Sequence, residues 1–125
     1  MKTILIIDDN EAIRETLGIF FKEKGFNVLT AGDGNKGMAL LNDNHVDLVI
    51  LDMIMPEKDG VETLQDLKKF SSKIPTIAIS GGREIPPEFY LKTAKELGAK
   101  YTFRKPFDRN DILFAVNEAL KDNET

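Results

Sequence analysis

Three aspartates, a serine and a lysine occupy corresponding places along this 125-residue sequence, each at the end of a short apolar run. Asp8 and Asp9 follow ILII, Asp52 follows VDLVIL, Ser80 follows TIAI, and Lys105 stands two residues after YTF. Taken singly, each has an ordinary explanation, because acids cap helices and polar residues beside glycine or proline are common in turns. If the fold brings them together, they could form one reactive site.

The chemistry that fits this set is phosphoryl transfer assisted by a divalent cation. Three carboxylates at close range repel one another, and a bound cation relieves the repulsion. Since the candidate ligands Asp8, Asp9 and Asp52 offer only oxygen, they favour a hard ion such as Mg²⁺. Asp52 could then attack phosphorus as a carboxylate nucleophile and form an acyl phosphate. Lys105 and the cation would neutralise the phosphoryl oxygens, and Ser80 would donate a hydrogen bond to one of them.

Five apolar runs alternate with five amphipathic segments and would position these side chains. Three of the runs are nearly continuous and rich in β-branched residues, which is typical of parallel strands covered on both faces. The segments between the runs carry apolar residues at helical spacing, with Gly25 and Gly98 as stops and Asp108 as a cap. This alternation predicts a doubly wound α/β fold with a five-stranded parallel sheet and five helices. The predicted strands are 4–7, 28–30, 46–51, 76–79 and 101–103.

A doubly wound sheet binds its ligands beyond the carboxyl ends of its strands. Four of the five runs bring reactive side chains to that edge, whereas the second run is followed by Ala31 and Gly32. We therefore expect the second strand to lie at one side of the sheet, outside the cluster. In the loops at this edge, Met55-Pro56 predicts a turn, and the glycines of SGGREIPPEF predict a mobile segment.

Composition excludes other classes of protein and site. The sequence has no cysteine, which rules out disulfides, thiolate zinc sites and cysteine nucleophiles. Its 21 acidic and 17 basic side chains give a net charge of −4, so we expect no direct binding to nucleic acid or to an anionic membrane. The first apolar run is too short for a signal peptide or a membrane span. A single cytosolic domain is therefore expected.

Four motifs in order resemble the receiver domain of two-component response regulators, in particular its single-domain, chemotaxis-regulator-like members. They are IIDDNEAIR, the D-x-x-M-P-x-x-D-G pattern at 52–60, the strand ending IAIS, and RKPF at 104–107. The similarity extends from about Lys2 to Leu120. It implies a receiver domain over residues 1–125, with no effector domain in this chain, and a strand order of 2-1-3-4-5.

The resemblance also implies a role for each site residue. Asp52 would accept the phosphoryl group from a phosphohistidine on a sensor histidine kinase or a phosphotransfer protein. Asp9 and Asp52 would ligate Mg²⁺ directly, Asp8 would help through water, and the backbone carbonyl of Ile54 would complete the protein ligands. Lys105 would pair with the phosphate. The chain would catalyse its own phosphorylation in part and would otherwise not be an enzyme.

Switching is also implied by the resemblance, with one departure. Ser80 would move toward the phosphoryl group and change the surface offered to an unknown downstream protein, and the bond to Pro106 is expected to be cis. Thr102 stands where most members carry a tyrosine or phenylalanine, and strand alternation puts Tyr101 and Phe103 on the opposite face. A variant coupling through Thr102 is therefore expected.

Two other functions compete with this interpretation. An aspartate-nucleophile, metal-dependent phosphatase would need a second aspartate two residues after the nucleophile, where this chain has Ile54. A flavodoxin-type cofactor carrier would need a Ser/Thr-Gly phosphate loop after the first strand, where Asp8 and Asp9 would repel a phosphate. The single histidine, His45, is expected to be an exposed side chain remote from the site.

Overall fold

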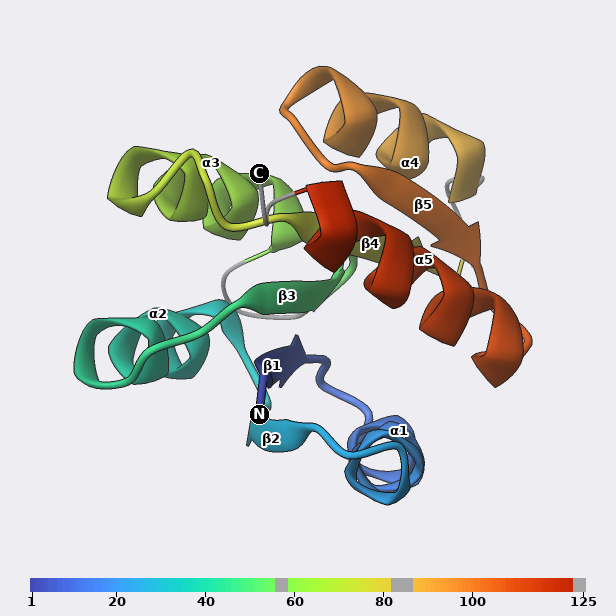
Figure 1. Cartoon of the computed structure of the whole chain (residues 1–125). Coiled ribbons are helices and arrows are strands. Elements are labelled where there is room, and N and C mark those ends of the chain that lie inside the picture. Colours follow the sequence, from blue (N-terminus) through green and yellow to red (C-terminus); the bar gives the residue numbers. More distant parts are fainter. Residues whose placement is uncertain (56–58, 82–86, 123–125) are drawn as a thin grey trace.

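The computed structural model describes residues 1–55, 59–81 and 87–122, in which five strands and five helices alternate along the chain (Figure 1). The predicted turn at Pro56 and most of the predicted mobile segment after Gly81 lie outside these residues. The strands are β1 (Thr3–Ile7), β2 (Asn27–Ala31), β3 (Leu48–Asp52), β4 (Thr76–Ser80) and β5 (Tyr101–Arg104). The helices are α1 (Glu11–Glu23), α2 (Gly34–Asp43), α3 (Gly60–Phe70), α4 (Pro87–Glu96) and α5 (Arg109–Asp122).

The strands form one parallel sheet in the order β2-β1-β3-β4-β5. The predicted fold class and the strand order implied by the resemblance are both confirmed, and β2 lies at one side of the sheet as expected. Helices α2, α3 and α4 cover one face, while α1 and α5 cover the other (Figure 1). Among the described residues, no helix is long and apolar enough to span a bilayer.

Two apolar layers hold the helices against the sheet. Every residue of β3 and β4 is buried, because their side chains point alternately into the two layers. This double burial is the physical reason for the continuous apolar runs in the sequence. One layer includes Leu64 and Leu67 of α3, and the other includes Leu17 and Phe21 of α1.

Capping and stop residues lie at several helix ends, among them the predicted Asp108, Gly25 and Gly98. Asp59 and Asp108 each accept a hydrogen bond from a backbone amide in the first turn of the following helix, at 2.9 and 2.8 Å. Gly25 and Gly98 follow α1 and α4 with φ angles of 94° and 107°. Because this left-handed region favours glycine, both residues act as the predicted stops.

The start of β3 differs from the prediction. The strand begins at Leu48, two residues later than the apolar run suggested, although Val46 is buried. Asp47 instead makes a reciprocal connection to β1: its Oδ2 accepts from the Thr3 amide at 2.8 Å and its amide donates to the Thr3 carbonyl at 2.9 Å. His45 beside it is 84% exposed, as predicted, and lies 2.9 Å from Asp47 Oδ1.

Gly60 permits α3 to begin directly against the end of β3. A Cβ atom at this position would lie 2.3 Å from the Met53 Cα and 2.7 Å from the Asp52 carbonyl oxygen. Because these are backbone atoms, they cannot move aside without shifting the loop that carries Asp52. We expect Gly60→Ala to lower the free energy of unfolding by about 2 kcal/mol, as overpacking does elsewhere.

The matched control for this substitution is Gly18→Ala, in the middle of α1. A Cβ atom there would meet only Val28 Cγ1, at the ordinary distance of 3.7 Å. We expect Gly18→Ala to be neutral or to stabilise by up to about 1 kcal/mol, since alanine is the better helix former. Urea unfolding of both variants would measure the contrast. Equal stabilities for the two variants would contradict the packing described for Gly60.

Candidate functional site

The carboxyl ends of four strands bring the five predicted side chains together. Asp52 and Ser80 are the last residues of β3 and β4. The apolar runs of the sequence predict strands that end one residue before each of them. Asp8 directly follows β1, and Lys105 directly follows β5. Since the strands are parallel and in register, these side chains meet at one edge of the sheet.

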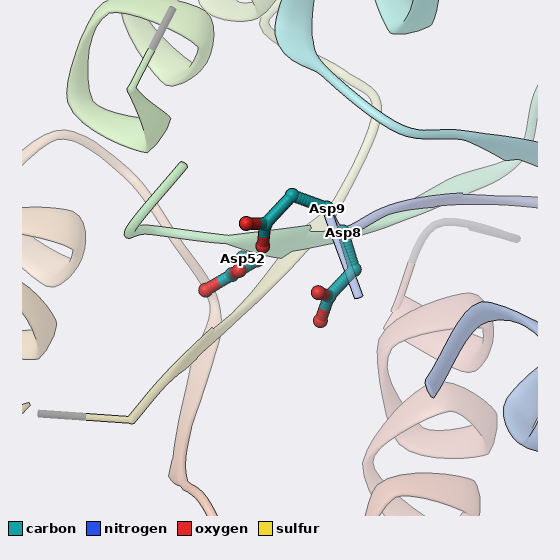
Figure 2. Close-up of side chains that lie close together, drawn as sticks. All are labelled: Asp8, Asp9 and Asp52. Atoms are coloured by element: carbon teal, nitrogen blue, oxygen red, sulfur yellow. The ribbon is translucent and has the colours of Figure 1, made fainter. Parts of the chain in front are cut away.

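The three aspartates form a compact acidic cluster. One carboxylate oxygen from each of Asp8, Asp9 and Asp52 lies within 4.8 Å of the others (Figure 2). Asp8 is fully buried and Asp52 is 2% exposed. Asp9 is exposed and faces the solvent side of the cluster. The site is therefore a cluster of negative charge in which two carboxylates are buried and that of Asp9 is exposed to solvent.

Lys105 supplies the positive charge. Its Nζ lies 3.0 Å from Asp8 Oδ2 and 3.4 Å from Asp52 Oδ2, although the contact with Asp8 lacks the geometry of a hydrogen bond. Its amide donates to the Ser80 carbonyl at 2.9 Å, and its peptide bond to Pro106 is cis. The Lys105 side chain packs closely against Gly81: a Cβ atom at position 81 would lie 3.2 Å from Lys105 Cβ and Cδ.

The pKa of Asp52 is raised to about 8, mainly by burial and next by the negative charge of Asp8, with a smaller contribution from a hydrogen bond with Asp9. Lys105 and the Ile54 amide, which donates to Asp52 Oδ1 at 3.2 Å, lower it only in part. A carboxyl group that is protonated near neutral pH is poised to exchange its proton for a cation.

Ser80 is the last residue of β4, and Thr102 lies in the neighbouring strand β5; their roles in switching remain predictions. Ser80 Oγ is fully buried and has no hydrogen-bond partner among the described residues. Since buried hydroxyl groups are normally paired, this one is available to a group entering the site. Thr102 pairs with Ala78 of β4. Tyr101 and Phe103 pack together against the layer under α1 and α5, which confirms that they share the face opposite to Thr102.

The donor set fits Mg²⁺. Asp8, Asp9 and Asp52 are close enough to share one ion, and oxygen-only carboxylate sites are typical of this cation. Ile54 lies beside the cluster, because its backbone amide donates a hydrogen bond to Asp52 Oδ1. The role of its carbonyl as a further ligand remains a prediction.

Two residues near the site were missed by the sequence analysis. Gly81 stands beside Lys105, and Arg14 of α1 donates from Nη1 to the Asp8 carbonyl oxygen at 2.7 Å. The only sequence signal for Arg14 is a cation in the first helix after the acid pair, which is common on solvated helix faces. Its contact with Asp8 depends on how α1 packs against the sheet.

Comparison with known proteins decides which family this site belongs to. The family described as "Response regulator receiver domain" matches residues 4–117. The chain belongs to this family. Receiver domains are signalling switches rather than conventional enzymes, and they bind Mg²⁺ at an aspartate cluster such as this one. Nothing found for this chain supports the alternative of a phosphatase.

The curated relatives differ in how much of their length this receiver covers. Sporulation initiation phosphotransferase F from Bacillus subtilis (strain 168) is 35% identical over 117 residues, which are 94% of this chain and 92% of the relative. Transcriptional regulatory protein CpxR from Klebsiella pneumoniae subsp. pneumoniae (strain HS11286) is also 35% identical, over 97% of this chain. The receiver spans only half the length of that regulator, and about a quarter of GlrR from Escherichia coli (strain K12).

Solved receiver domains have the same fold across the whole chain. A response regulator receiver domain protein (CheY-like) from Methanospirillum hungatei JF-1 aligns with a TM-score of 0.91 at 25% identity, covering 99% of this chain and 97% of its own. A receiver domain from Clostridium thermocellum gives the same TM-score at 28% identity, covering 99% and 98%. The arrangement of strands and helices is thus shared by receivers whose sequences differ at most positions.

Proposed function

We propose that this receiver is a phosphorylation-dependent switch in which Asp52 is the phosphoryl acceptor. The observation that carries the proposal is the convergence of a buried carboxylate, two neighbouring carboxylates and the Lys105 ammonium group at one open edge of the sheet. Ser80 adds a buried hydroxyl group at the same edge, and this group has no hydrogen-bond partner in the described part of the chain. Each of these groups has a task in phosphoryl transfer.

The donor we propose is a phosphohistidine on a sensor histidine kinase or a phosphotransfer protein, met in the cytoplasm. A carboxylate oxygen of Asp52 attacks phosphorus, the new P–O bond forms as the P–N bond breaks, and the electron pair leaves with the imidazole nitrogen, which takes up a proton. Asp8, Asp9 and Asp52 would hold Mg²⁺, which supplies charge neutralisation to the phosphoryl oxygens. Lys105 exchanges its pairing with Asp8 and Asp52 for the incoming phosphoryl group.

The output we propose is a change of binding partner. Ser80 donates its free hydroxyl hydrogen to a phosphoryl oxygen, which draws the end of β4 toward Asp52. Thr102 lies on the neighbouring strand, on the face covered by α2, α3 and α4, where a small polar side chain replaces the aromatic toggle of most receivers. The downstream protein is unknown, and a pull-down that compares phosphorylated with unphosphorylated protein is the way to identify it. We assign this role to one domain over residues 1–125.

Labelling with a small acyl phosphate tests the proposal without a partner kinase. We expect acetyl phosphate with Mg²⁺ to phosphorylate the wild-type protein, and EDTA to prevent the reaction. Asp52→Ala should remain unlabelled because it lacks the nucleophile. Intact-protein mass spectrometry measures the yield. Equal labelling of Asp52→Ala would reject the assignment, and turnover of a generic aryl phosphate ester would instead favour a phosphatase.

Ile54 is expected to slow the loss of the phosphoryl group. Its half-buried apolar side chain stands next to Asp52, where a polar side chain could position a hydrolytic water molecule. We expect Ile54→Asn to shorten the lifetime of the phosphorylated protein by about tenfold, less than a general base contributes, because asparagine can only orient the water.

Ile54→Val is the control for this prediction. It keeps an apolar side chain and the hydrogen bond from the backbone amide to Asp52. Phosphate release after removal of the donor gives both lifetimes. A lifetime for Ile54→Asn equal to or longer than that of the wild-type protein would show that Ile54 does not protect the phosphoryl group.

A further inference from the structure

Asp8 is held by its backbone as well as by its side chain. Its amide donates to the Ala31 carbonyl of β2 at 3.1 Å, and its carbonyl accepts from Arg14 Nη1 at 2.7 Å. Its side-chain Oδ1 accepts from the Asn10 amide at 2.9 Å. The residue is therefore fixed from β2, from α1 and from its own loop, independently of any ion in the site.

Arg14 reaches Asp8 by crossing Gly32. A Cβ atom at Gly32 would lie 3.3 Å from Arg14 Nη1 and 3.7 Å from Cζ, so the guanidinium group lies close over the glycine. The first distance is tighter than ordinary carbon contacts, and a larger side chain would displace the guanidinium group from its path. The segment after β2 brings no reactive side chain to the site. Its contribution is Gly32, which leaves room for the Arg14 side chain.

The contact made by Arg14 is one of orientation rather than charge pairing. Its described hydrogen bond goes to a backbone carbonyl, and among the described residues no ion pair joins it to an aspartate. That carbonyl belongs to the peptide unit between Asp8 and Asp9. Since a peptide unit is planar, fixing its carbonyl constrains the backbone dihedrals on both sides, and with them the directions of both carboxylates.

We propose that Arg14 is a positioning residue for the acidic cluster: by holding the Asp8 carbonyl, it keeps Asp8 and Asp9 aimed at the space that they share with Asp52, and Gly32 serves to let it cross. This inference rests on the proposed function, because it assigns the cluster to a divalent cation. Arg14 itself touches neither the cation nor the phosphoryl group.

Titration of ¹⁵N-labelled, metal-free protein with Mg²⁺, followed by NMR, tests the proposal. We expect Arg14→Ala to weaken Mg²⁺ binding by about 10- to 100-fold, the usual cost of losing a group that orients metal ligands. Arg14→Lys should recover most of this loss because a single N–H donor is enough. Before any Mg²⁺ is added, the amide signals of residues 8–10 should already shift in Arg14→Ala.

A double-mutant cycle separates positioning from a general structural effect. Gly32→Val should weaken Mg²⁺ binding as Arg14→Ala does, and the double variant should be no weaker than either single one, because both changes remove the same contact. Arg109→Ala is the control: it removes an exposed guanidinium group at the start of α5, which lies 5.1 Å from the centroid of the Phe20 ring. We expect its Mg²⁺ affinity to equal that of the wild-type protein.

The outcomes distinguish this inference from the proposed function. If Arg14→Ala binds Mg²⁺ within twofold of the wild-type affinity, or if the effects of Arg14→Ala and Gly32→Val add fully, the positioning role is wrong while the acceptor assignment stands. If Arg14→Ala does not fold, Gly32→Val decides by the same criterion, because it displaces the guanidinium group and leaves Arg14 in place. If the wild-type protein itself binds no Mg²⁺, both the inference and the proposed metal site are overturned.

Discussion

Replacing Asp52 with asparagine is expected to make the metal-free protein more stable at pH 7, by about 2 to 4 kcal/mol. The pKa of Asp52 rises from an ordinary 3.8 to about 8 in the folded protein because burial and the charge of Asp8 oppose its ionisation. A group with a raised pKa stabilises the fold fully below its unfolded pKa, and this stabilisation is lost as pH rises toward the folded pKa. Asparagine is uncharged throughout, so it avoids this cost.

Urea unfolding at pH 5, 7 and 8 in the presence of EDTA measures the effect. The advantage of Asp52→Asn should grow with pH across this range, and Mg²⁺ should reduce it by stabilising the wild-type protein more than the variant. Asp43→Asn, at an exposed position in α2, is the control and should change stability little at any pH. An Asp52→Asn variant that is no more stable than the wild-type protein at pH 8 would contradict the electrostatic description of the site.

Replacing Lys105 with methionine is expected to slow phosphorylation by acetyl phosphate by about 100-fold, as loss of one group that stabilises transition-state charge does elsewhere. The lysine Nζ stands within 3.4 Å of both Asp8 and Asp52, which places it where the phosphoryl oxygens would arrive. Methionine keeps the aliphatic stem that packs beside Gly81 but removes the charge.

Arg104→Ala is the matched control for Lys105→Met. Arg104 is the preceding residue and pairs with Glu88 at 2.7 Å, but both side chains are more than half exposed, so the pair contributes little. The phosphorylation rate of Arg104→Ala should equal that of the wild-type protein. Intact-protein mass spectrometry at saturating Mg²⁺ measures both rates. Equal rates for Lys105→Met and Arg104→Ala would show that Lys105 does not act on the phosphoryl group.

Much of the fold was predictable because burial leaves a direct record in the sequence. β3 and β4 are covered on both faces, so they read as continuous apolar runs, and Gly25, Gly98 and Asp108 mark helix ends by local chemistry. Burial and strand pairing are not the same thing, however. Val46 is buried without joining the ladder, because Asp47 next to it bonds to Thr3 instead. The order of the strands was implied by the family resemblance and not by the spacing of apolar residues.

The site was predictable to the extent that its residues stand at strand ends. Asp8, Asp52, Ser80 and Lys105 share that position, and parallel strands bring such positions together. Arg14, Gly32, Gly60 and Gly81 could not be found in this way, because each matters through a close approach set by tertiary packing. A glycine that leaves room for a lysine or a loop looks the same in a sequence as a glycine in any turn.

Locating the phosphoryl group tests the central claim most directly. Wild-type protein treated with acetyl phosphate and Mg²⁺ would be digested rapidly and its peptides mapped by tandem mass spectrometry, with and without hydroxylamine, which cleaves acyl phosphates. We predict one phosphoryl group, on Asp52, that hydroxylamine removes. A phosphoryl group on another residue, or one that resists hydroxylamine as a phosphoserine at Ser80 would, would contradict Asp52 as the acceptor.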